Sequence, residues 1–275
     1  MVKKMIEIDF GKIYSFSKLK RFENCPLNYY FYYLDPKWKG FQKPRSYKTK
    51  GQAVHGAITL FYYLPQKKRT FKNLKECLSQ AWFSELNPLK DPPLGQIGGF
   101  KDLHHERLEY AQSLKLLKNF LETAEPNPPI FFLPTEKIKD SFDDYEELIK
   151  PLNESFYVSG KFDRIDQLKD GSLRIIDFKT SKNNEDEFQL IFYKLLAELN
   201  FQVPVKTVSF YYLNKKQISN LDVSNIKRGE IQDQVLEKID EIENKKEFSP
   251  KVSPLCLHCD FLEICPTRKI KKFGT

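Results

Sequence analysis

An aspartate and a lysine two positions apart, Asp177 and Lys179, form the pattern with the clearest chemical potential in this sequence. They lie in and directly after a run of β-branched and aromatic residues, 173–178, that predicts a strand. Because side chains two apart on a strand face the same way, the carboxylate and the ammonium group share one face, while Ile176 and Phe178 point into the core. The strand therefore presents a negative and a positive group side by side.

A second carboxylate, Asp163, precedes this strand by one predicted hairpin. Asp170 and Gly171 lie between two strand-like runs, and both tolerate the positive φ of a tight turn. Pairing across the turn would let Asp163 approach Asp177, giving two hard oxygen ligands suited to Mg²⁺ or Mn²⁺. A metal ion there would act as a Lewis acid and lower the pKa of a bound water. The competing interpretation is that these charges only line the solvated face of an antiparallel hairpin.

The elements that must position these residues change in character along the chain. Four segments of the first half show helical spacing: 15–34, which Cys25-Pro26 interrupts, 49–64, 73–86 and 102–123. Later segments predict strands over 130–139, 156–166, 173–178 and 207–213, and helices over 186–200 and 227–245. We therefore expect an α/β protein with a mainly helical part over 1–125, an α/β core over 126–215 and a C-terminal helix with a cysteine motif over 216–275.

The composition indicates a packed globular protein. Apolar residues make up 40% of the 275 residues and charged residues 30%, which excludes a disordered or low-complexity chain. The formal net charge of +8 favours an acidic partner such as nucleic acid, although a solvated surface is the ordinary place for any single lysine. Glu7 and Asp9 stand where a signal peptide needs its apolar run, and no stretch approaches the roughly 20 apolar residues of a membrane span. These features predict a cytoplasmic protein with no membrane partner.

Cysteine usage predicts a second metal site. The chain has five cysteines, an odd count, and Cys256, Cys259 and Cys265 lie within ten residues of one another. In a reducing compartment this pattern favours metal over disulfide. Together with Cys25, they supply four thiolates, which can hold an iron–sulfur cluster or a structural Zn²⁺; the Cys-x-x-Cys spacing alone does not decide between them. We expect Cys77 to be a small buried apolar residue.

The acidic residues and their surroundings resemble the core of the PD-(D/E)XK nuclease superfamily, in particular its RecB-like and AddB-like branch, which includes CRISPR-associated exonucleases. In that branch a strand ending in Gly-x-x-Asp-Arg-x-Asp precedes a strand carrying Asp-x-Lys. The matching positions here are Gly160, Asp163, Arg164, Asp166, Asp177 and Lys179. The resemblance implies a single nuclease domain over 1–275, with a restriction-endonuclease-like core in which helices flank a central mixed β-sheet.

Two further elements occur in the order of that branch. Residues 51–55, from glycine to His55, are similar to its upstream Gly-x-x-x-His element, and Gln189 and Tyr193 are similar to its downstream Gln-x-x-x-Tyr element. The resemblance implies that His55 completes the metal shell and that Gln189 and Tyr193 flank the active site and the DNA strand. Glu136 is a weaker candidate for metal or structural support, and the competing interpretation places it on a solvated face.

The resemblance also implies roles for the central residues. Asp163 and Asp177 would bind Mg²⁺ or Mn²⁺ together with His55, and the carbonyl group of Phe178 would add a ligand. Lys179 would orient or activate the attacking water and stabilise charge that develops on the phosphate. Arg164 and Asp166 would form a supporting ion pair.

The position of the cysteines resembles that of 4Fe–4S-containing AddB-type and CRISPR-associated nucleases, with one cysteine before the nuclease core and three after it. The resemblance thus implies a 4Fe–4S cluster on Cys25, Cys256, Cys259 and Cys265, with Zn²⁺ as the alternative. The implied function is a metal-dependent DNA nuclease, an exonuclease acting on single-stranded ends, in DNA repair and recombination or in CRISPR adaptation. A helicase or CRISPR adaptation proteins would be separate partners. The alternative is a catalytically silent module that binds DNA ends and is stapled by a metal cluster.

Overall fold

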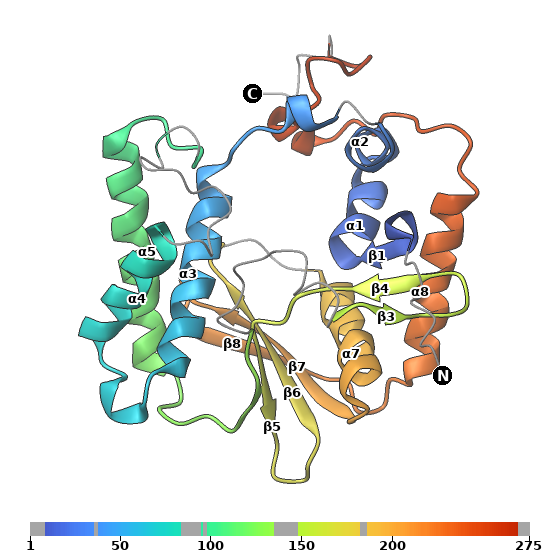
Figure 1. Cartoon of the computed structure of the whole chain (residues 1–275). Helices are drawn as coiled ribbons and strands as arrows, with labels where there is room; N and C mark the ends of the chain where they lie inside the picture. Colours follow the sequence, from blue (N-terminus) through green and yellow to red (C-terminus); the bar gives the residue numbers. More distant parts are fainter. Residues whose placement is uncertain are drawn as a thin grey trace, which may run out of the picture. The chain divides into compact units, whose positions relative to one another are not determined.

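A five-stranded mixed sheet forms the centre of the larger of two units in the computed structural model of the chain (Figure 1). The structure describes residues 9–35, 38–83, 95, 98–134, 148–181 and 186–268. The smaller unit consists of residues 1–43, 149–159 and 229–275, and the larger unit consists of residues 44–148 and 160–228.

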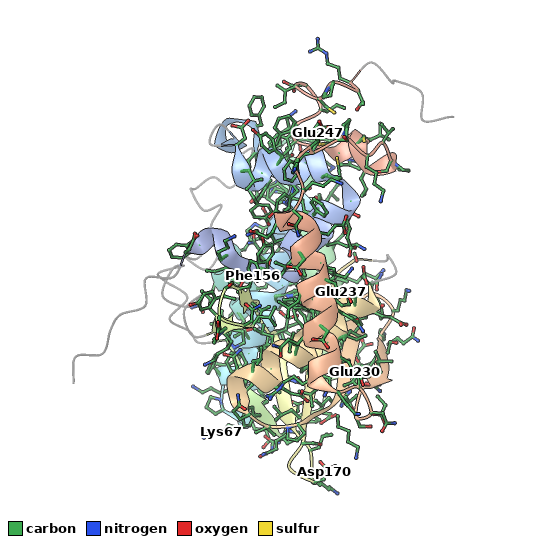
Figure 2. All side chains as sticks on the ribbon, turned by 90° about the vertical axis from the view of Figure 1, so that its right-hand side faces the viewer. Lys67, Phe156, Asp170, Glu230, Glu237 and Glu247 are labelled. Atoms are coloured by element: carbon green, nitrogen blue, oxygen red, sulfur yellow. The ribbon has the colours of Figure 1, made fainter. Side chains whose placement is uncertain are left out.

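The sheet of the larger unit has the strand order β2-β5-β6-β7-β8. Its strands are β2 (Ile130–Phe132), β5 (Arg164–Gln167), β6 (Leu173–Lys179), β7 (Val205–Tyr212) and β8 (Gln217–Asp222). Among the described strands of this sheet, β6 and β7 pair in parallel and the other neighbours pair antiparallel, and helix α7 (Glu187–Phe201) connects β6 with β7. The β5–β6 hairpin turns at Asp170-Gly171 as expected, and Figure 2 labels Asp170 at its tip. Gly171 has a φ of 84°, a conformation that glycine adopts without strain.

Helices cover both faces of this sheet (Figure 1). Helices α3 (Ser46–Tyr63), α4 (Phe71–Phe83) and α5 (Leu103–Thr123) share one apolar cluster with Ile176 and Phe178 of β6. Asp177 projects from the opposite side of β6, which faces α7. The expected alternation along β6 is confirmed, since Ile176 and Phe178 are buried in the core.

The smaller unit has its own three-stranded mixed sheet, in the order β1-β4-β3. Its strands are β1 (Ile13–Ser15), β3 (Lys150–Pro151) and β4 (Tyr157–Ser159), and its main helices are α1 (Phe16–Asn24), α2 (Pro26–Tyr29) and α8 (Arg228–Glu243). A π-helical turn, η2 (Tyr30–Leu34), continues α2, and the short helices η1 (Phe10–Lys12), η3 (Trp38–Phe41) and η5 (Pro254–His258) also belong here, while η4 (Gln66–Lys68) lies in the larger unit. Helix α8 is amphipathic: Ile231 and Val235 are buried, while Glu230 and Glu237 lie on its exposed side (Figure 2).

The prediction of one strand over 156–166 is wrong. The chain forms β4, leaves it at Gly160 and enters β5 at Arg164, so the two halves of the run belong to different sheets. Gly160 lies where helix α7 comes close, because a Cβ atom at this position would be 2.8 Å from Cδ2 of Leu196. Close packing of the backbone against α7 thus interrupts a run that local propensity would continue.

Three strands were not predicted, and one predicted strand extends outside the described residues. β1 and β3 are too short to show periodicity, and β8 is a largely polar strand at the edge of the sheet. The predicted strand over 130–139 is formed over 130–132, and Glu136 lies outside the described residues. No helix within the described ranges has the length and hydropathy needed to cross a lipid bilayer.

Gly99 lies against the backbone at the start of α3, and its replacement by alanine should destabilise the protein. Its φ is 79°, and a Cβ atom would lie 2.5 Å from the backbone nitrogen of Arg45. We expect Gly99→Ala to lower the free energy of unfolding by about 2–3 kcal/mol, because backbone strain and a backbone clash add together. Gly171→Ala is the matched control, since its φ of 84° is similar but its Cβ would meet no described atom within 4 Å. Urea denaturation of both variants checks this, and equal losses would contradict the proposed clash.

Candidate active site

Strand β6 places Asp177 and Lys179 together at its C-terminal end. Nζ of Lys179 lies 2.8 Å from Oδ2 of Asp177 and donates a hydrogen bond to Oε1 of Gln189 at 3.0 Å. Asp177 is only 7% exposed. The prediction that these two side chains share one face of a strand is confirmed by the ion pair.

Asp163 reaches the same end of the sheet, although not from a strand as expected. It lies in a bend directly before β5, whose first residue, Arg164, pairs with Ile176. One further step outward along this register brings Asp163 to the level of Asp177. Because it lies outside the strand, the Asp163 carboxylate can turn back and accept a hydrogen bond from the backbone N–H of Phe178 at 2.8 Å.

Helix α3 contributes His55, whose Nδ1 lies 2.8 Å from Oδ1 of Asp163. The two oxygens of Asp163 therefore have different partners: one is fixed by the backbone of β6 and the other by α3. The structure thus brings His55, Asp163, Asp177 and Lys179 together from segments more than 100 residues apart.

Burial and mutual charge shape the electrostatics of this group. Burial, and then the neighbouring Asp163, raise the pKa of Asp177 to about 6, against the opposing effects of Lys179 and His55. Burial alone would lower the pKa of His55, but the charge and hydrogen bond of Asp163, with a contribution from Asp177, raise it above its ordinary value. Two carboxylates at close quarters, one of them deeply buried, make this a site that favours additional positive charge.

The donor set fits a divalent cation in its chemistry. Within the ranges that the structure describes, no group of three or more His, Cys, Asp or Glu side chains is arranged to hold a metal ion. In this structure His55 lies against Asp163, and Lys179 lies against Asp177. Oδ2 of Asp177 is buried and forms an ion pair with Lys179 at 2.8 Å, and it has no hydrogen-bond partner of good geometry within the described residues. The two carboxylates are the kind of oxygen ligand that Mg²⁺ and Mn²⁺ prefer, and the imidazole of His55 lies against one of them.

Gln189 and Tyr193 extend the group along α7. Nε2 of Gln189 donates to the hydroxyl oxygen of Tyr193 at 3.1 Å, while its Oε1 accepts from Lys179. Burial, together with the charge of Asp177, raises the pKa of Tyr193 well above its ordinary range, so the phenol stays protonated. The two residues fix the direction of the Lys179 ammonium group from one helix face, as their spacing of four predicts.

The predicted Arg164–Asp166 ion pair is present and buried, with Nη2 of Arg164 2.9 Å from Oδ2 of Asp166. The sequence patterns did not indicate its third member, Tyr62, whose hydroxyl oxygen accepts a hydrogen bond from Nη1 of Arg164 at 2.7 Å. Tyr62 lies seven residues after His55, which is two helical turns, so the helical repeat could have identified it as a residue on the same face. The carbonyl group of Phe178, the remaining predicted ligand, belongs to the residue whose N–H binds Asp163.

The four cysteines of the motif all lie in the smaller unit as free, partly buried thiols. Three sulfur atoms receive N–H groups: Cys259 from Asn28 Nδ2 at 3.2 Å, Cys25 from the backbone of Lys251 at 3.4 Å, and Cys256 from the backbone of Ser253 at 3.5 Å. Burial raises the pKa of Cys259, and the charges of Cys25 and Cys256 add to the effect. Cys265 lies 3.1 Å from the hydroxyl of Thr267.

These thiols do not by themselves form a metal-binding arrangement, since the described part of the chain contains no group of three potential ligands placed to hold a metal ion. The predicted cluster therefore stays a prediction. Cys77 is buried in the apolar cluster of the larger unit, as expected.

Comparison with known proteins gives a family and several relatives. The model of the PD-(D/E)XK nuclease superfamily matches residues 13–266. A subunit of the "ATP-dependent helicase/deoxyribonuclease" of Streptococcus pyogenes is 27% identical over 190 residues, which are 67% of this chain and 16% of that protein. The chain thus spans less than a fifth of that relative. The "Gene 69 protein" of Mycobacterium phage D29 is 22% identical over 276 residues, covering 93% of this chain and 97% of the phage protein.

A second phage protein and one solved structure are also similar to this chain. The "Gene 69 protein" of Mycobacterium phage L5 is 23% identical over 287 residues, covering 93% of this chain and 96% of its own. A solved structure described as "Crystal structure of SSO0001" covers 79% of this chain and 84% of its own at 15% identity, with a TM-score of 0.31. Two mixed sheets flanked by helices are consistent with a restriction-endonuclease-like fold.

Proposed function

This chain belongs to the PD-(D/E)XK nuclease superfamily, and we propose that it is a metal-dependent deoxyribonuclease that hydrolyses phosphodiester bonds from single-stranded DNA ends. The observation that carries the proposal is the convergence of Asp163, His55, Asp177 and Lys179 at one end of β6. The similarity to an enzyme whose name includes "deoxyribonuclease" supports DNA as the substrate.

The proposed roles are those that the family resemblance implies, and the contacts within the site support them. Asp163, Asp177 and His55 would hold Mg²⁺ or Mn²⁺, with the carbonyl group of Phe178 as a further ligand. A bound divalent cation supplies Lewis-acid polarisation of the phosphate and a water of lowered pKa. Lys179, held in place by Gln189 and through it by Tyr193, orients the attacking water and stabilises negative charge that develops on the phosphate oxygens.

The experiment is cleavage of end-labelled single- and double-stranded DNA by anaerobically purified protein, with Mg²⁺, with Mn²⁺ and with chelator. Metal-dependent shortening from single-stranded ends is the expected result, and the label position reveals the polarity. If the protein binds DNA but cleaves it under none of these conditions, the chain is a module that only binds DNA ends.

We place this activity in the processing of DNA ends during repair and recombination, beside a helicase on a separate chain. The name of the streptococcal relative, which combines helicase with deoxyribonuclease, supports such a partner. A role in CRISPR adaptation stays a prediction from the resemblance alone.

We further propose that Cys25, Cys256, Cys259 and Cys265 hold a 4Fe–4S cluster that staples the smaller unit, with Zn²⁺ as the alternative. The N–H donors that face the sulfur atoms of Cys25, Cys256 and Cys259 support this, because such donors stabilise thiolate ligands.

Cys259→Ser should remove the cluster. In anaerobically purified protein we expect loss of the brown colour and of bound iron and sulfide, together with a lower melting temperature, because metal binding contributes directly to folding. Cys77→Ala is the matched control, since it removes a thiol of the other unit and should leave the iron content unchanged. Zinc in place of iron in the wild-type protein would favour the alternative, and a metal-free wild-type protein would exclude both.

A further inference from the structure

Helix α3 is tied to the start of β5 at two points. His55 contacts Asp163 at 2.8 Å, and Tyr62 accepts a hydrogen bond from Arg164 at 2.7 Å. Asp163 and Arg164 are consecutive, whereas His55 and Tyr62 are two helical turns apart on one face of α3. Asp163, which is proposed to bind metal, and the next residue, Arg164, therefore both contact α3.

The second tie is buried and polar. Arg164 and Tyr62 are 3% and 4% exposed, and Asp166, which pairs with Arg164, is 2% exposed. The guanidinium carbon of Arg164 lies 5.0 Å from the centre of the Tyr62 ring. Nε of Arg164 and Oδ1 of Asp166 are both buried without a hydrogen-bond partner within the described residues, so the group is only partly satisfied.

Stability alone does not account for this group. A buried ion pair loses much of its Coulomb attraction to desolvation, and apolar side chains of similar volume commonly stabilise a fold at least as well. What a planar guanidinium adds is direction, because its donors fix the position of each acceptor. The apolar contacts of α3, through residues such as Val54 and Ile58, are non-directional and do not by themselves orient a polar side chain of the helix.

We propose that Arg164 and Tyr62 are positioning residues that hold α3 in register with β5 and so set the place of His55 relative to Asp163. The inference rests on the proposed function, in which His55 and Asp163 share a metal ion. Asp163 is already fixed by the N–H of Phe178, so the helix is the adjustable side of the site. Displacements of about 1 Å in such a site are enough to weaken it substantially.

Tyr62→Phe tests this, because it removes one hydroxyl group and keeps the ring. In calorimetric titrations of the full chain with Mn²⁺, we expect the Kd to rise about tenfold, the lower end of the effect of losing a residue that orients metal ligands. Tyr63→Phe is the matched control: it makes the same change at the next residue of α3, where the hydroxyl donates to the carbonyl oxygen of Pro134. Its Kd should equal that of the wild type.

Two further measurements separate positioning from a general loss of stability. In a His55→Ala background, Tyr62→Phe should cause no additional loss of Mn²⁺ affinity, because its effect passes through His55. In metal-free protein, the NMR signals of the His55 ring should shift in Tyr62→Phe and not in Tyr63→Phe. An unchanged Kd, or an equal loss with and without His55, would overturn the inference.

Failure of the proposed function would look different. A wild-type protein that neither binds Mn²⁺ nor cleaves DNA would overturn the nuclease assignment. The NMR comparison in metal-free protein would still test the positioning role, because unchanged His55 signals in Tyr62→Phe would refute that role whether or not the protein is a nuclease.

Discussion

Asp177→Asn should lower the rate of DNA cleavage by on the order of 10³-fold while leaving the protein folded. The change keeps the shape of the side chain and removes the charge that would bind the metal ion beside Asp163. It also removes one of two like charges: the pKa of Asp177 is raised to about 6 by burial and by Asp163, so its ionised form carries an energetic cost in the folded protein. We therefore expect a melting temperature equal to or slightly above that of the wild type, measured by circular dichroism.

The matched control is Asp170→Asn, which makes the same substitution at the exposed tip of the β5–β6 hairpin. Its cleavage rate should match that of the wild type. Removal of a metal ligand or oxyanion donor commonly lowers the rate far more than about tenfold. If Asp177→Asn kept more than about a tenth of the wild-type rate, Asp177 would not be a metal ligand in the proposed mechanism.

Arg164→Leu should lower the free energy of unfolding by about 3–5 kcal/mol, because it leaves Asp166 as an uncompensated buried charge. The double variant Arg164→Leu/Asp166→Leu should recover most of this loss, since no unpaired charge then remains. Urea denaturation at neutral pH measures both. Arg107→Leu, on the exposed side of α5, is the control and should change stability by less than about 0.5 kcal/mol.

The loss in Arg164→Leu should also depend on pH. Burial raises the pKa of Asp166 above its ordinary value, even against the charge of Arg164. A carboxyl group whose folded-state pKa is raised favours folding in its protonated form, so its contribution is present at low pH and is lost as pH rises through the folded-state pKa. Arg164→Leu removes the charge that opposes this shift, so the folded-state pKa of Asp166 is higher still in the variant. The difference in stability between Arg164→Leu and the wild type should therefore shrink as the pH falls and Asp166 becomes protonated. A difference that stays constant from about pH 7 to about pH 4 would show that Asp166 is not the buried charge responsible.

The relations inside single elements were predictable because backbone geometry alone sets them. The two-residue repeat of a strand placed Asp177 beside Lys179, and the helical repeat placed Gln189 beside Tyr193. Cys25-Pro26 interrupts the first long helix where the sequence predicts it, since the residue before a proline disfavours helical backbone.

The tertiary structure decided the relations between elements. Asp163 was expected on a strand and lies in the bend before it, because the approach of α7 at Gly160 forces the chain out of one sheet before it enters the other. The contact of Tyr62 with Arg164 joins residues 102 positions apart, and no local repeat connects them. By itself the sequence determined which functional groups share a face, because φ and ψ preferences act over a few residues. Only packing and strand register, which act between distant segments, decided which of those faces meet.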